Sequence, residues 1–160
     1  GVLVLDPRKT KQIVYNLLAN AVKFSASGGR VILSARRVDR DVVGTLAGEW
    51  PVYGFPLADS EHKQFLELCV SDTGIGISQE DMAKLFQAFS QIDSSLARKF
   101  EGTGLGLAMV KQLAQLHGGS VAVASLVGAG ARFVVWLPLR DSGQTPRPQV
   151  TRATTPWPMY

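Results

Sequence analysis

The stretch Phe65–Ile77, FLELCVSDTGIGI, joins an alternating apolar segment to a glycine-rich turn. Alternation with a period of two predicts a half-buried β-strand, because successive side chains of a strand point to opposite faces. Leu66, Leu68 and Val70 share one face with Asp72, and this face should pack beneath helices. The sequence therefore predicts a strand within a sheet-and-helix core, with a carboxylate at its buried end.

A buried carboxylate is costly unless a hydrogen-bond donor meets it, and two kinds of donor could meet Asp72. An adenine amino group is one, and Gly74 and Gly76 would then let the base approach the backbone. The local amides of a strand-to-helix turn are the other. The motif alone leaves both interpretations open.

The segments around this strand alternate between helical and extended patterns. The expected elements are a helix over 7–25, strands over 30–38 and 65–72, helices over 78–86 and 104–117, and strands over 121–125 and 131–139. This order favours an α+β fold, a two-layer α/β sandwich with helices on one face of a mixed, mostly antiparallel sheet.

Two segments depart from this alternation of helical and extended patterns. Residues 39–64 form an unusually long connection rich in apolar side chains, with or without a short hairpin of its own. We expect this connection to cover the outer face of the sheet, where Val134 and Trp136 would otherwise be exposed. After Arg140 the composition turns rich in proline, threonine and arginine, which predicts a domain over 1–140 and a flexible tail or linker over 141–160.

Composition excludes several classes of protein. The chain has 160 residues, enough for one domain, and its 46% hydrophobic content excludes wholesale disorder. A single cysteine excludes a disulfide scaffold and a Cys-rich zinc site. No apolar run approaches the roughly 20 residues that cross a bilayer, so we expect a cytoplasmic domain, with a membrane-bound parent left open. The net charge of +4 suits an anionic ligand as well as nucleic acid.

A row of polar side chains marks the first expected helix. Gln12, Asn16, Asn20 and Lys23 recur at steps of four and three, so they share one stripe that borders the apolar arc. Asparagine is a poor interior helix residue, because its side chain competes for backbone hydrogen bonds. The stripe is either a solvated face or contains a buried amide bonded to a neighbouring loop. The alternative is that its side-chain oxygens ligate a hard cation while Lys23 meets a phosphate.

The third motif is GTGLGL at residues 102–107, at the start of an expected helix. Amides at a helix N-terminus hold phosphates in many proteins. A dinucleotide-binding fingerprint would need a preceding strand and a different glycine spacing, so it is excluded. A plain helix-capping turn remains the alternative for this motif alone.

Taken together, the ordered motifs NLLANAVKF, VSDTGIGI, LFQAFSQ and EGTGLGLAMV resemble the ATP-binding catalytic domain of sensor histidine kinases. These kinases belong to the Bergerat-type (GHKL) family, which also contains gyrase-like and heat-shock ATPases. The resemblance covers about residues 1–140 and implies the Bergerat fold with a mobile ATP lid. The implied ligands are ATP or ADP and Mg²⁺.

The resemblance also assigns roles. Asn20 would be the Mg²⁺ ligand, Asn16 and Lys23 would lie beside the phosphates, and Phe24 would border the nucleotide. Asp72 would accept a hydrogen bond from the adenine amino group and so recognise the base. The glycine box after it supplies further contacts, at Gly74, Gly76 and Ile77.

The remaining implied contacts flank the lid, which would run over residues 90–101. Phe86 and Phe89 resemble the aromatic box that anchors its start. Arg98 and Lys99 are candidate phosphate contacts, although a solvated basic loop is the alternative. The far hinge would supply backbone amides from Gly102, Thr103, Gly104, Leu105, Gly106 and Leu107.

One position separates the subclasses of this family. Asn16 stands where the hydrolysing relatives carry a glutamate general base, and an amide cannot take up a proton at neutral pH. A neutral imidazole already has a lone pair, so transfer to histidine needs no strong base. This favours a histidine kinase, with Asn16, Lys23 and Arg98 as the catalytic residues.

The partners follow from what the chain lacks. His62 and His117 are its two histidines, and neither lies in a phosphoacceptor motif. We therefore expect the dimerisation and phosphoacceptor helices to precede Gly1 in the full protein, with a response regulator or receiver domain as an indirect partner. We expect no nucleic acid and a monomeric isolated domain. The alternatives are a non-catalytic, nucleotide-regulated interaction module and a Bergerat-type ATPase, and Asn16 argues against the latter.

Overall fold

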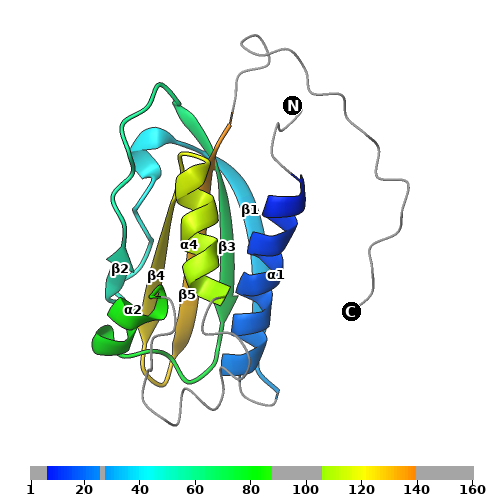
Figure 1. Ribbon diagram of the computed structural model, residues 1–160. Coiled ribbons are helices and arrows are strands. Elements are labelled where there is room, and N and C mark those ends of the chain that lie inside the picture. Colours follow the sequence, from blue (N-terminus) through cyan, green and yellow to red (C-terminus); the bar gives the residue numbers. More distant parts are fainter. Residues whose placement is uncertain (1–6, 26–27, 88–105, 140–160) are drawn as a thin grey trace.

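In the part of the chain that the structure describes, three α-helices lie against one face of a five-stranded sheet, which gives two layers (Figure 1). The computed structural model describes residues 7–25, 28–87 and 106–139. The helices are α1 (Pro7–Phe24), α2 (Gln79–Leu85) and α4 (Gly106–Leu116). The predicted α+β sandwich is confirmed.

The strands of the sheet follow the order β1-β3-β5-β4-β2. Their bounds are Val31–Asp39 for β1, Val52–Gly54 for β2, Gln64–Asp72 for β3, Ser120–Leu126 for β4 and Gly130–Pro138 for β5. Every neighbouring pair is antiparallel, so the expectation of a mixed sheet is wrong for the described residues. The predicted hairpin between the last two strands is present, with Leu126 opposite Gly130.

The sheet has a core on each face. Side chains of α1, α4 and the inner face of the sheet form the larger core, which includes Ile13, Leu17, Leu68 and Val110. The alternation of β3 places Leu66, Leu68 and Val70 in this core, as predicted.

The outer core centres on Trp136, which is 0% exposed, with Phe65, Val38, Ala122 and Val134 around it. Residues 39–64 cover this core, and the side chains that they contribute are those of Val42, Val43, Leu46 and Leu57. The prediction that this connection packs over Val134 and Trp136 is therefore confirmed.

The sequence left open whether the connection has a hairpin of its own, and the structure shows none within residues 39–64. Its short strand β2 instead pairs with β4, with Tyr53 opposite Val123. Because β1 and β2 lie at opposite edges of the sheet, the chain crosses the whole outer face to reach β4 (Figure 1). It then returns to begin β3, next to β1.

Two arginines fix the connection to the sheet. Arg132 on β5 donates to the Ala47 carbonyl at 2.9 Å, and its guanidinium lies 4.9 Å from the centre of the Trp50 ring. Arg40, in a short 3-10 helix after β1 (Arg40–Val42), donates to the carbonyls of Ala58 at 2.8 Å and His62 at 3.0 Å. Planar guanidinium groups suit this task, because they present several donors in a fixed geometry.

We expect Arg40→Ala to loosen the returning segment of the connection. The change removes hydrogen bonds to Ala58 and His62 and to the Ser60 hydroxyl, 2.9 Å away, at a cost of about 1–2 kcal/mol in unfolding free energy. Amide hydrogen exchange should accelerate over residues 58–63. Arg37→Ala, at an exposed arginine of β1, is the matched control and should leave this exchange unchanged. Equal exchange in both variants would contradict the assignment.

Helix ends follow local rules. Ser78 caps α2 by accepting a hydrogen bond from the Asp81 amide at 3.2 Å, which is the N-cap bond of a capping box. His117 follows α4, and its Nδ1 donates to the Leu113 carbonyl at 2.7 Å, as expected for a capping residue. Among the described residues no helix combines the length and apolar character needed to cross a membrane.

Candidate functional site

The predicted site residues gather at one end of the sandwich. At the lower end in Figure 1, α1 and β3 finish and α4 begins. Asn20 lies in the last turns of α1, Asp72 is the last residue of β3, and Gly106 is the first of α4. Three separate sequence motifs are thus brought to one end of the fold.

Asp72 is buried and only half satisfied. It is 3% exposed, and its Oδ1 accepts a hydrogen bond from the Gly74 amide at 2.9 Å. Its Oδ2 is buried and has no hydrogen-bond partner among the described residues. Burial raises the pKa of this carboxyl, while the nearby amides of Gly74 and Ala131 oppose the shift.

This geometry accommodates both interpretations of the motif. The local turn is real, because one carboxylate oxygen is held by Gly74. The other oxygen has no partner within residues 7–25, 28–87 and 106–139, and most buried polar atoms in proteins have one. A buried acceptor that finds no donor in the described part of the chain is therefore a candidate contact for a ligand that brings a donor.

Asn20 is buried at the edge of the core and is 7% exposed. Its Nδ2 donates to the carbonyl of Asn16 at 2.9 Å, one turn earlier in α1. Since this bond uses the amide nitrogen, it restrains the side-chain rotamer without occupying the Oδ1 acceptor. Asn16 itself is half-buried, and Lys23, near the end of α1, is exposed.

The protein oxygen offered by Asn20 suits a hard cation that is also bound by the phosphates of a ligand. In residues 7–25, 28–87 and 106–139 there is no cluster of three or more His, Cys, Asp or Glu able to hold a metal. Mg²⁺ is commonly bound by one or two protein oxygens together with substrate phosphates. The Asn20 Oδ1 is a ligand of this kind, so the residues fit a magnesium ion that arrives with a nucleotide.

The glycine turn after Asp72 is tied to its neighbours by hydrogen bonds. The Thr73 amide donates to the Arg30 carbonyl at 3.1 Å, and the Arg30 amide donates to the Thr73 hydroxyl at 2.9 Å. The Ile75 carbonyl accepts from the Gly128 amide at 2.8 Å. The turn is therefore fixed to the end of the α1–β1 loop and to the β4–β5 hairpin.

Gly76 has a structural reason to be glycine. Its φ is 73°, in the left-handed region, and a Cβ there would collide with the Leu126 carbonyl. Gly76 was expected to leave room for a nucleotide base. The close approach of the β4–β5 hairpin is a second reason for glycine at this position. Ile77 is 2% exposed in the helix-side core, and its amide already donates to the Ser125 hydroxyl at 2.8 Å.

Ser125 is a supporting residue that sequence reasoning missed. Its hydroxyl accepts from Ile77 and donates to the Gly130 carbonyl at 2.6 Å, and it is 1% exposed. A signal was available, because Ser125 follows Val121 and Val123 at inward-facing positions of an apolar strand. A polar residue in that series indicates a buried hydrogen bond.

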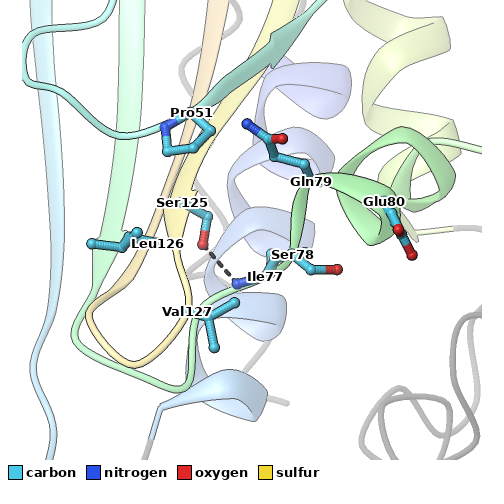
Figure 2. Close-up of a pocket in the computed structure, with 8 residues that line it drawn as sticks. All are labelled: Pro51, Ile77, Ser78, Gln79, Glu80, Ser125, Leu126 and Val127. Carbon is cyan, nitrogen blue, oxygen red and sulfur yellow. Dashed lines mark hydrogen bonds between the residues drawn. The ribbon is translucent and has the colours of Figure 1, made fainter.

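A pocket of about 460 Å³ lies beside this turn, between α2 and the β4–β5 hairpin (Figure 2). Figure 2 shows the Ile77–Ser125 hydrogen bond in its wall. The lining residues are Pro51, Ile77, Ser78, Gln79, Glu80, Ser125, Leu126 and Val127. Ile77 is the one candidate site residue among them. The pocket lies at the same end of the fold as Asp72, which pairs with Ala131 of the hairpin, but neither Asn20 nor Asp72 lines it.

The remaining candidates are placed only in part. Gly106 is half-buried at the start of α4, and Leu107 is 4% exposed within the core, so a contribution from Leu107 would come through its amide. Several candidates lie outside the described residues, namely Phe89, Arg98, Lys99, Gly102, Thr103, Gly104, Leu105 and the side chain of Phe24.

Sequence comparison identifies relatives of the chain. The family described as histidine kinase-, DNA gyrase B- and HSP90-like ATPases matches residues 5–141. The circadian input-output histidine kinase CikA of Synechococcus elongatus is 44% identical over 133 residues, which cover 83% of this chain and 14% of CikA. Sensor histidine kinase WalK of Bacillus subtilis is 34% identical and covers 86% of this chain and 19% of WalK. The chain therefore spans less than a quarter of the length of these relatives.

Solved structures agree with the fold. A mycobacterial sensor histidine kinase, MprB, superposes with a TM-score of 0.62 at 30% identity, over 86% of this chain and 77% of that one. Full-length ShkA in complex with AMPPNP gives a TM-score of 0.61 at 29% identity, over 88% of this chain and 23% of that one. Fold, motif order and relatives agree: the chain belongs to the histidine kinase-, DNA gyrase B- and HSP90-like ATPase family, among the catalytic domains of sensor histidine kinases.

Proposed function

We propose that this chain binds Mg²⁺-ATP and donates the γ-phosphoryl group to a histidine on a separate dimerisation domain, in two-component signal transduction. The observation that carries this proposal is the buried Asp72 Oδ2, which has no hydrogen-bond partner in the described part of the chain. An adenine amino group would supply the missing donor. Membership of an ATPase family supports ATP as the nucleotide.

The phosphate end of the nucleotide would lie toward α1. Asn20 would offer its Oδ1 to Mg²⁺, and the bond from its Nδ2 to Asn16 would hold that oxygen in place. The ion would neutralise phosphate charge when bound. Lys23 and Arg98 would complete the charge neutralisation that dominates phosphoryl transfer.

The identity of residue 16 supports transfer rather than hydrolysis. Asn16 has no group that can accept a proton at neutral pH, so it cannot activate water as a general base. A neutral histidine acceptor needs no such activation, because its imidazole already has a lone pair. A protein–histidine kinase thus fits these residues better than an ATPase with a mechanical role.

The wider setting belongs to the same proposal. Residues 1–140 would form the catalytic domain, with 141–160 as a tail or linker. The partners would be the dimerisation and phosphoacceptor helices of the parent kinase and, through them, a receiver domain. The location would be cytoplasmic.

Calorimetry tests the proposal directly. The chain should bind ATP in the presence of Mg²⁺, and should not release phosphate at an appreciable rate on its own. When mixed with a helical fragment from a relative that carries its phosphoacceptor histidine, it should transfer labelled phosphate to that fragment. A well-folded chain with no measurable nucleotide affinity would overturn the proposal, and rapid phosphate release would favour an ATPase instead.

A further inference from the structure

We propose that Phe55 is a positioning residue for the nucleotide site, which braces α2 against α4. Phe55 comes directly after β2, in the long connection between β1 and β3. It lies outside the motifs that identify the family. The proposal rests on the proposed function, because it concerns how that site is held in shape.

The backbone of Phe55 is anchored at the edge of the sheet. Its amide donates to the Val121 carbonyl at 3.2 Å, and its carbonyl accepts from the Ser120 hydroxyl at 2.6 Å. Ser120 is 1% exposed, so this second bond is shielded from water. A residue held at both backbone groups presents its ring at a defined place.

The ring of Phe55 touches an element on each side. It meets the Phe86 ring edge to face, with centroids 5.4 Å apart and planes at 89°. The Lys111 ammonium of α4 lies 4.3 Å from the centre of the same ring. Tyr53 supports it from β2, also edge to face, at 5.5 Å. T-shaped aromatic pairs and cation–π contacts are both attractive and directional.

These two elements frame the candidate site. Phe86 is the C-cap of α2, and α2 follows the glycine turn that begins at Asp72. Lys111 lies in α4, which begins at Gly106. A ring that contacts both elements fixes α2 and α4 relative to each other, and thereby fixes the two sides of the site that follow Asp72 and Gly106.

The test compares two variants from the same connection. Phe55→Ala removes the ring, and Leu57→Ala removes a side chain of similar size that packs on the outer core instead. We expect Phe55→Ala to weaken Mg²⁺-ATP binding about five- to tenfold by calorimetry. Leu57→Ala should leave the affinity within twofold of wild type even where it lowers the melting temperature. Phe55→Tyr keeps the aromatic ring and should restore most of the affinity.

Amide hydrogen exchange without nucleotide gives an independent measurement. Phe55→Ala should accelerate exchange in α2 and at the start of α4, while Leu57→Ala should accelerate it near residues 57–63. Wild-type ATP affinity in Phe55→Ala, or an equal loss of ATP affinity in Leu57→Ala, would overturn the proposal that Phe55 positions α2 and α4. A wild-type chain that binds no ATP, yet shows the expected exchange pattern, would overturn the proposed function and leave the brace intact.

Discussion

Asp72→Asn should greatly weaken ATP binding by this chain while making the nucleotide-free chain more stable. The variant keeps an oxygen for the Gly74 amide but puts an NH₂ group in place of Oδ2, which has no partner among the residues that the structure describes. The asparagine NH₂ group and the adenine amino group would then be two donors facing each other with no acceptor between them, so the affinity should fall at least about thirtyfold. Titration calorimetry with Mg²⁺-ATP measures this loss.

The same substitution should raise the unfolding free energy of the nucleotide-free chain. The reason is that the hydrogen bonds of the buried wild-type carboxylate do not fully offset its loss of hydration. Burial raises the pKa of the Asp72 carboxyl above its usual range, so the folded chain holds this proton more tightly than the unfolded chain. The contribution of Asp72 to stability is complete below the unfolded pKa and is lost as the pH rises through the folded pKa. At neutral pH the charged group therefore costs stability, and the neutral asparagine should recover about 1 kcal/mol.

Urea unfolding at several pH values checks this sign. The stability advantage of Asp72→Asn over wild type should be greatest at neutral pH and should vanish at acid pH. Asp59→Asn, at an exposed aspartate of the connection, is the matched control and should change neither affinity nor this pH profile. A variant that binds ATP within threefold of wild type would contradict the role of Asp72.

The parts of the fold that sequence predicted are those with a local periodic signal. The alternation over 65–72 placed Leu66, Leu68 and Val70 in the core, and the helical spacing of Ile13 and Leu17 located α1. The pairing of β2 with β4 has no such signal, because the two segments are about 70 residues apart and β2 is only three residues long. A short strand paired across the sheet is decided by tertiary contacts.

In the candidate site, too, residues with a local sequence signal were predicted and those defined by tertiary contacts were not. Asn20 and Asp72 were found because each is a polar residue at a position that the surrounding pattern assigns to the core, and such local conflicts concentrate at functional sites. The hairpin contact of Gly76 was not predicted, because a ligand and a nearby backbone select glycine for the same reason. Phe55 was overlooked because an aromatic residue in a loop gives no indication of what its ring will touch.

Asn20→Ala should remove the magnesium-dependent part of ATP binding. The change deletes the Oδ1 that would ligate the ion, together with the Nδ2 bond to the Asn16 carbonyl that orients it. Because Mg²⁺ in such sites has few protein ligands, the loss of one should weaken Mg²⁺-ATP binding about tenfold or more. In excess EDTA, wild type and variant should bind ATP with similar, weaker affinity.

The comparison with and without metal separates a ligand from a merely structural amide. Gln12→Ala is the matched control, since Gln12 is an exposed amide on the same stripe of α1, and it should preserve the full magnesium dependence. Asn20→Asp keeps a carboxylate oxygen for the ion but loses the donor to Asn16, so it should retain part of the dependence. If Asn20→Ala instead weakened ATP binding equally with and without Mg²⁺, Asn20 would support the fold or the phosphates, and the metal would have to be held by other residues.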